Sequence, residues 1–114
     1  MRVGLLGLGS WGTALAAHLG DGGHDLTAWT LESEDRAAIA RDRENRRLLP
    51  GRMLPERMRI VETPAEAVAG AEIALLAVPS LALRGVAGEI APAYPKSGRA
   101  WGGERGGTAG VARP

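Results

Sequence analysis

Several residue types are missing or scarce in this 114-residue chain, and each absence excludes a class of protein. There is no cysteine, which excludes a disulfide scaffold, a thiolate nucleophile and a cysteine-ligated metal site. Phenylalanine is also absent, and there are only one tyrosine and three tryptophans, so any core is built mainly from aliphatic side chains. No apolar run reaches the roughly 18 residues that a membrane-spanning helix requires.

The chain also lacks an excess of charge of one sign. The net charge of +1, from 14 basic and 13 acidic residues, provides no general basic field for nucleic acid or a membrane surface. We therefore expect neither nucleic-acid binding nor membrane insertion. The chain opens directly on a strand-like segment without the pattern of a signal peptide, which predicts a cytoplasmic protein. Its length allows one small domain.

Short apolar segments alternate with helical patterns along the first 95 residues. We expect strands at residues 3–6, 26–29, 58–61 and 72–78, separated by helices at 12–20, 33–43 and 63–69 and followed by a helix from residue 80. Residues 44–55, with two prolines, are expected to form a loop. This alternation predicts an α/β fold, in which a parallel sheet carries helices on both faces.

Polar residues mark where three of these helices begin. Thr63, Pro64 and Glu66 have the spacing of a capping box with proline in the first helical position. Ser33 and Ser80 are expected to cap the helices that follow them.

The composition changes near residue 95. Glycine, arginine, alanine and proline make up 13 of the residues from 96 to 114, with no strand or helix period. We expect residues 1–95 to form the domain and residues 96–114 to be a disordered tail. Such a composition is also typical of a frameshift in a GC-rich gene.

The most informative motif is the glycine-rich turn formed by Gly7, Gly9 and Gly12. It follows a strand and opens a helix within a strand-helix-strand unit of about 30 residues, as dinucleotide-binding turns do. Gly7 would permit a tight turn, Gly9 the approach of a pyrophosphate, and Gly12 close packing of the helix. Glu32 follows about 20 residues after this turn, which is the sequence spacing expected of an acidic residue that binds the ribose of a dinucleotide. A tight turn without a ligand is the alternative.

Other candidate groups have ordinary explanations. His18 and His24 are isolated and are expected to be surface residues, so we predict no metal site. Trp29 is expected to pack on the sheet. Neither Ser10 nor Ser80 has a histidine suggested nearby, which leaves no support for a serine nucleophile. A cluster of arginines is interleaved with acids and favours a solvated loop over a phosphate site; it comprises Arg41, Arg43, Arg46, Arg47, Arg52 and Arg57.

Four stretches together resemble the NAD(P)-dependent glycerol-3-phosphate dehydrogenases. They are Gly-Leu-Gly-Ser-Trp-Gly-Thr-Ala-Leu at 7–15, Leu-Thr-Ala-Trp at 26–29, Glu-Asn-Arg-Arg-Leu-Leu-Pro-Gly at 44–51, and Ala-Val-Pro-Ser at 77–80. The resemblance covers residues 1 to about 95. It implies a Rossmann fold and the transfer of hydride between a nicotinamide cofactor and dihydroxyacetone phosphate or sn-glycerol 3-phosphate, which feeds phospholipid synthesis.

The resemblance also implies where the cofactor lies. Ser10 and Trp11 should lie against the pyrophosphate, and Pro79 and Ser80 near the nicotinamide. Bacterial members usually carry basic residues after the second strand, where this chain has Leu31 and Glu32. Because a carboxylate repels a 2′-phosphate and accepts from a 2′-hydroxyl, we expect NADH to be preferred over NADPH.

The resemblance implies a second domain that carries a catalytic lysine, and we expect this chain to lack a counterpart of that domain. The Arg-Gly pair at 105–106 occupies the expected place of a family Lys-Gly pair, but no apolar strand leads into it. We therefore expect a cofactor-binding part that is inactive alone. The alternatives are a stand-alone dinucleotide-binding or redox-sensing module, or a cofactor domain of a neighbouring reductase family.

The usual order of such a sheet, 3-2-1-4, makes the fourth strand an edge. Its backbone would be open to pairing with another chain, so we expect self-association there.

Overall fold

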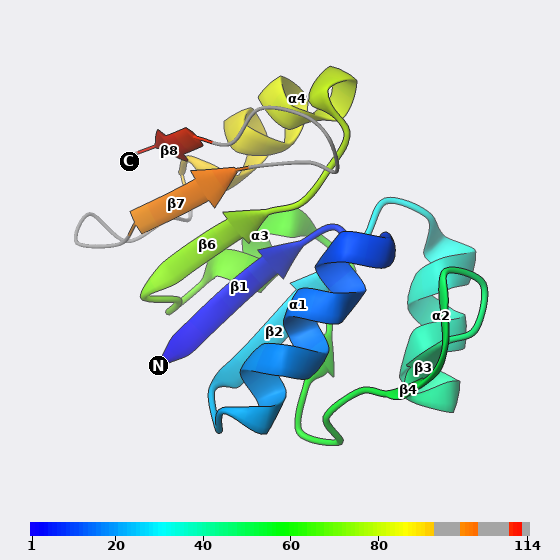
Figure 1. Ribbon diagram of the computed structural model, residues 1–114. Helices are drawn as coiled ribbons and strands as arrows, with labels where there is room; N and C mark the ends of the chain where they lie inside the picture. The colour runs from blue at the N-terminus through cyan, green and yellow to red at the C-terminus, as the bar shows by residue number, and fades with distance from the viewer. Residues whose placement is uncertain (93–98, 103–109, 113–114) are drawn as a thin grey trace.

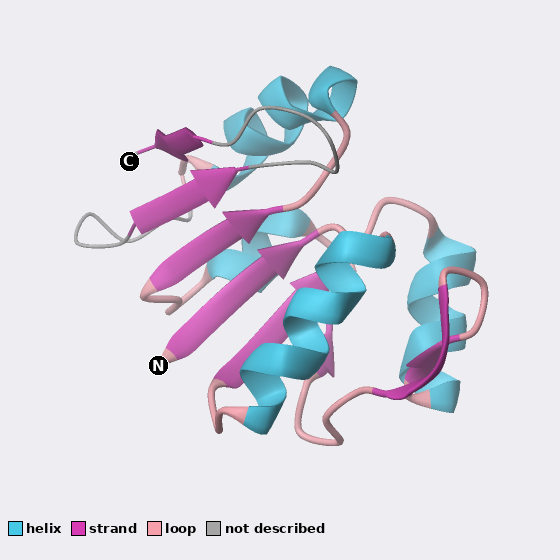
Figure 2. Cartoon of the chain, in the orientation of Figure 1, coloured by secondary structure: helices cyan, strands magenta, loops and turns pink. Residues whose placement is uncertain are grey.

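A computed structural model describes residues 1–92, 99–102 and 110–112. One sheet runs through it in the order β5-β2-β1-β6-β7-β8, with helices on both faces (Figures 1 and 2). Its strands are β1 (Arg2–Leu6), β2 (Asp25–Trp29), β5 (Arg59–Ile60), β6 (Ile73–Leu76), β7 (Arg99–Gly102) and β8 (Gly110–Ala112). The helices are α1 (Ser10–Asp21), α2 (Ser33–Asp42), α3 (Pro64–Val68) and α4 (Ser80–Ile90).

The four predicted strands lie in the predicted order. β1 pairs in parallel with β2 on one side and with β6 on the other, and β2 pairs in parallel with β5. Leu6, the last residue of β1, stands opposite both Trp29 and Leu76. The carboxyl ends of the three central strands therefore meet at one edge of the sheet.

Each face of the sheet buries its own apolar core, because side chains alternate along β1. Val3 and Leu5 belong to the core under α1 and α2, whereas Leu6 belongs to the core under α3 and α4. Gly4 brings α3 close to the sheet, since an added Cβ would lie 2.4 Å from the carbonyl oxygen of Ala67. Trp29 is buried in the second core, as expected, and its indole donates to the carbonyl oxygen of Glu62 at 3.2 Å.

The helix starts confirm one prediction and correct two. α3 begins as predicted, with the Thr63 hydroxyl accepting from the Glu66 amide at 3.2 Å. The N-cap of α2 is Glu32 and not Ser33, and that of α4 is Pro79 and not Ser80. In both helices the serine is the first helical residue, and the N-cap residue before it makes no side-chain hydrogen bond to the helix.

The expected loop at 44–55 contains a small antiparallel hairpin of β3 (Glu44–Asn45) and β4 (Leu49–Met53). Arg43, in the left-handed region with φ 54°, turns the chain out of α2 into this hairpin. Most of β4 is exposed, so the segment lacks the apolar alternation by which strands are recognised.

Residues expected to form a disordered tail include two strands. β7 lies parallel to β6, from Ile73 opposite Arg99 to Leu76 opposite Gly102, and β8 pairs antiparallel with β7. β6 is therefore an inner strand and not the predicted edge. β7 pairs with the backbone of β6, and the composition of residues 96–114 alone does not reveal that such a partner is available. Residues 93–98, 103–109 and 113–114 lie outside the described part, and so does the rest of the tail prediction.

Candidate dinucleotide site

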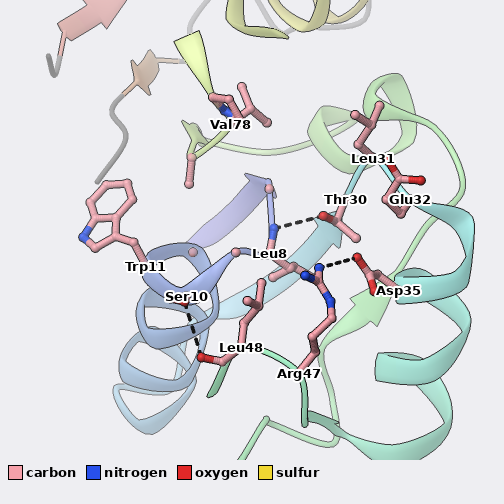
Figure 3. Close-up of a pocket in the computed structure, with 15 residues that line it drawn as sticks. Leu8, Ser10, Trp11, Thr30, Leu31, Glu32, Asp35, Arg47, Leu48 and Val78 are labelled. Carbon is pink, nitrogen blue, oxygen red and sulfur yellow. Dashed lines mark hydrogen bonds and ion pairs between the residues drawn. The ribbon is translucent and has the colours of Figure 1, made fainter. Parts of the chain in front are cut away.

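A pocket of about 380 Å³ opens at the carboxyl ends of β1, β2 and β6 (Figure 3). From β1 the chain moves outward to β2 and β5, then crosses back to β6 on the other side. Ligands of open α/β sheets bind where the direction of winding reverses in this way. The pocket is lined by residues 7–12 after β1, 30–32 after β2 and 77–79 after β6, together with Asp35, Arg47 and Leu48.

The three glycines of the turn differ in what confines them. Gly7 has φ +111°, and an added Cβ would lie 2.3 Å from the carbonyl oxygen of Ala77. At Gly12, a Cβ would lie 2.0 Å from the carbonyl oxygen of Gly7. Close packing against backbone atoms therefore explains why glycine is needed at both Gly7 and Gly12. Gly9 is different, because a Cβ there meets nothing within 4 Å and its φ is ordinary. The space over Gly9 is open, as a bound phosphate requires.

A buried polar network fixes the shape of this turn. The carbonyl oxygen of Leu8 accepts from the Asn45 amide at 2.8 Å and from the Thr13 hydroxyl at 3.2 Å. The Leu8 amide donates to the hydroxyl of Thr30 at 3.2 Å. Asn45 also donates to the Thr13 oxygen at 3.0 Å. The turn is thus held by α1, by the end of β2 and by the hairpin before any ligand arrives.

The hairpin also forms one wall of the pocket. The Ser10 hydroxyl donates to the carbonyl oxygen of Leu48 at 3.3 Å, and the Leu48 amide donates to the side-chain oxygen of Asn45 at 3.2 Å. Figure 3 shows Leu48 beside the amino end of α1. Backbone amides at that end and the helix dipole make it a favourable place for phosphate groups.

The loop after β2 is fixed by Arg36. Its guanidinium donates to the carbonyl oxygens of Thr30 at 2.7 Å and Leu31 at 3.0 Å, and also pairs with Glu62 at 3.2 Å. Only 12% of the Arg36 side chain is exposed, whereas Leu31 and Glu32 are exposed at the pocket. A largely buried cation thus shapes the loop whose exposed residues line the pocket.

The predicted arginine cluster is divided among several partners. Arg46 pairs with Asp42 and Glu44, and Arg52 pairs with Asp21, while Arg43 donates to the carbonyl oxygen of Met58. Arg41 donates to Asp42, which lowers the pKa of Asp42 and raises that of Arg41. These pairs agree with the expected solvated loop. Arg47 departs from it, since it lines the pocket and pairs with Asp35 at 2.9 Å.

The structure brings together the predicted cofactor residues Gly7, Gly9, Ser10, Trp11, Gly12, Leu31, Glu32 and Pro79 along one pocket. Ser80 begins α4 next to Pro79, and its side chain lies outside the described part. Sequence reasoning missed Thr30, Asp35, Arg47 and Leu48. Thr30 follows a predicted strand end and was accessible to the same argument. Asp35 lies in the first turn of the predicted helix α2, whereas Arg47 and Leu48 reach the pocket only through the unpredicted hairpin.

Two other kinds of feature are absent from the described residues. No helix there is both long and apolar enough to cross a membrane. No group of three histidine or acidic side chains there is placed to hold a metal ion.

Comparison with known proteins identifies the family. Residues 2–103 match the family described as NAD-dependent glycerol-3-phosphate dehydrogenase N-terminus. The glycerol-3-phosphate dehydrogenase [NAD(P)+] of Halorhodospira halophila is 43% identical over 93 residues, which cover 82% of this chain and 28% of the relative. That of Thermus thermophilus is 45% identical over 93 residues, covering 82% and 29%. The chain thus spans less than a third of these relatives.

A solved structure agrees. The glycerol-3-phosphate dehydrogenase of Coxiella burnetii superposes with a TM-score of 0.85 at 30% identity, over 91% of this chain and 32% of that one. The family match extends to residue 103, beyond the expected boundary at 95, and includes β7. This chain belongs to the NAD-dependent glycerol-3-phosphate dehydrogenase family and corresponds to its N-terminal, NAD(P)-binding domain.

Proposed function

We propose that the pocket binds a nicotinamide dinucleotide with its pyrophosphate over Gly9, at the amino end of α1. The observation that carries this proposal is the contrast among the three glycines. Gly7 and Gly12 are confined by neighbouring atoms, whereas Gly9 faces open space in an otherwise fixed turn. The position of the pocket at the reversal of the sheet supports the same ligand.

The remaining residues take their places from this anchor. Ser10 and Trp11 lie at the pyrophosphate, Leu31 and Glu32 at the adenosine ribose, and Pro79 and Ser80 toward the nicotinamide. Glu32 is exposed at the pocket, where its carboxylate can accept from a 2′-hydroxyl and repel a 2′-phosphate. We expect NADH to bind more tightly than NADPH, and tighter binding of NADPH in a titration would contradict this.

The reaction served is hydride transfer between the cofactor and dihydroxyacetone phosphate or sn-glycerol 3-phosphate. When bound, the dihydronicotinamide supplies the hydride, and the residues of this chain hold and orient it. Matched relatives are more than three times as long as the aligned segment. We expect this chain to bind NADH and to leave dihydroxyacetone phosphate unreduced on its own.

Calorimetric titration with NADH tests the proposal on the full chain, with Gly9→Ala and Gly88→Ala as a matched pair. Both glycines have open space and no strained φ, but Gly88 lies in α4, away from the pocket. The added methyl at position 9 should occupy the phosphate position and weaken binding about tenfold or more. Gly88→Ala should bind like the wild type. A wild-type chain that does not bind NADH, or equal binding by both variants, would overturn the proposal.

A stand-alone binding or redox-sensing module is the second candidate. The observation favouring it is the pairing of β7 and β8 beyond β6, which extends the sheet within this chain. A sensor requires the oxidised and reduced cofactors to bind with clearly different affinities. Titration of NAD⁺ beside NADH tests the sensing role, since equal affinities would argue against it.

A further inference from the structure

An ion pair of Asp35 with Arg47 lies on the side of the pocket where we have proposed the adenosine ribose, and we refer to it as the rim pair. Asp35 comes from the first turn of α2, and Arg47 from the segment between β3 and β4. Their closest atoms are 2.9 Å apart, and both residues line the pocket with Glu32 (Figure 3). This pair is not part of the glycine-rich turn.

The two partners are exposed to different degrees. The side chain of Arg47 is 62% exposed and that of Asp35 is 28% exposed. The adjacent Leu48 is held through its amide by Asn45, which fixes the backbone beside Arg47 at the pocket wall. Arg47 therefore presents a guanidinium to the pocket, and Asp35 neutralises it there.

The other arginine near this loop cannot serve the same purpose. Arg36 is largely buried, and its guanidinium is already bonded to two backbone carbonyls and to Glu62. Releasing it would dismantle the loop that carries Leu31 and Glu32. Arg47 has a single acidic partner given by the structure and ample contact with solvent, so a competing anion can reach it.

We propose that the rim pair is a second determinant of cofactor choice, in which Asp35 keeps Arg47 from attracting the 2′-phosphate of NADPH. This inference rests on the proposed dinucleotide function and assigns it a residue pair separate from Glu32. Phosphate and carboxylate groups both form bidentate hydrogen bonds with a guanidinium, so they compete for it. NADH has no 2′-phosphate and leaves the pair undisturbed.

A set of single and double variants tests the inference. Removing the charge by Asp35→Asn should lower the dissociation constant for NADPH about three- to fivefold, the range of a partly exposed ion pair. The value for NADH should change by less than about twofold. In the double variant Asp35→Asn with Arg47→Gln, the gain for NADPH should disappear, because the cation that provides it is gone.

The matched control is Asp21→Asn. Asp21 also pairs with an arginine, Arg52, but at the far end of α1. Asp21→Asn changes the net charge of the chain as much as Asp35→Asn does, so a general electrostatic effect on NADPH affinity would appear in both variants. Circular dichroism and thermal unfolding verify that every variant is folded.

The outcomes are distinguishable. A gain for NADPH in Asp35→Asn alone, lost in the double variant, supports the rim pair. Equal gains in Asp35→Asn and Asp21→Asn, a gain for both cofactors, or a gain that survives Arg47→Gln would overturn it and leave the proposed function intact. A wild-type chain that binds neither NADH nor NADPH would overturn the proposed function and this inference together.

Discussion

At the scale of single residues, the pocket is shaped by groups that never need to touch a ligand. Gly12 is an example, because its missing side chain lets α1 begin directly against the carbonyl oxygen of Gly7. Arg36 is another, since it fixes the backbone that displays Leu31 and Glu32. Changes at these positions should therefore affect stability first and binding second.

Gly12→Ala is expected to destabilise the fold. A Cβ placed 2.0 Å from a backbone oxygen cannot be relieved by rotating a side chain, so the turn or α1 must move. Overpacking of this kind costs about 1–3 kcal/mol or more. Urea unfolding measures the loss, with Gly9→Ala as the control within the same turn. Unfolding midpoints that match for the two variants would contradict the geometry.

Arg36→Ala is expected to lower the free energy of unfolding by about 1–3 kcal/mol, because two carbonyls lose a charged donor. Lysine at this position keeps the charge but not the planar fork, so Arg36→Lys should recover only part of the loss. Arg2→Ala, which removes an exposed pair with Glu72, provides the control and should change stability by less than about 1 kcal/mol. Equal losses at both arginines would argue against a special role for Arg36.

Sequence predicted the residue-scale features that are local and missed those that are not. Gly7, Gly9 and Gly12 carry a fixed spacing with a physical reason for each member. Asp35 and Arg47 carry no such spacing, and their meeting depends on the backbone reversal at Arg43 and on the hairpin that follows. The ion pair of Asp35 with Arg47 depends on a hairpin that was not predicted, so it cannot be derived from the sequence around either residue.

At the scale of elements, the small hairpin is the part that connects the site to the core. Asn45 is buried and bonds to the Leu8 oxygen, the Thr13 hydroxyl and the Leu48 amide. Through these bonds a mostly exposed segment holds the glycine-rich turn and places Arg47 and Leu48 on the pocket wall. The role of the hairpin could not be predicted from its largely polar sequence, because exposed strands and loops have similar sequences.

Asn45→Ala is expected to reduce both stability and NADH affinity. It leaves polar partners unsatisfied in a buried place, at a cost of about 1–3 kcal/mol, and it frees the hairpin from the turn. Thr63→Ala is the control, since losing the cap of α3 costs about 1 kcal/mol without touching the pocket. Unfolding and NADH titration are compared for both. An Asn45 variant with wild-type NADH affinity would show that the hairpin does not support the site.

At the scale of the whole molecule, the sheet exceeds what the sequence pattern predicted. The alternation of strands and helices predicted the α/β class, because each unit has a clear local period, and the usual Rossmann arrangement predicted the order of four strands. β7 was missed because its composition is poor in apolar residues, and its partner β6 supplies the pairing. The family match to residue 103 agrees with this extension of the sheet. Self-association through β6 loses its structural basis when β7 covers that strand.

Removal of β7 should restore the edge and the association expected of it. A chain ending at residue 95 leaves the backbone of β6, with its sequence Ile-Ala-Leu-Leu, open to pairing with another copy. We expect its apparent mass in light scattering to rise with concentration. A chain ending at residue 109 lacks β8 but keeps β7 over β6, so it provides the matched control and should associate far less. If the two truncated chains showed the same dependence on concentration, β7 would not be what protects β6, and the pairing of Leu75 with Trp101 would carry no weight in solution.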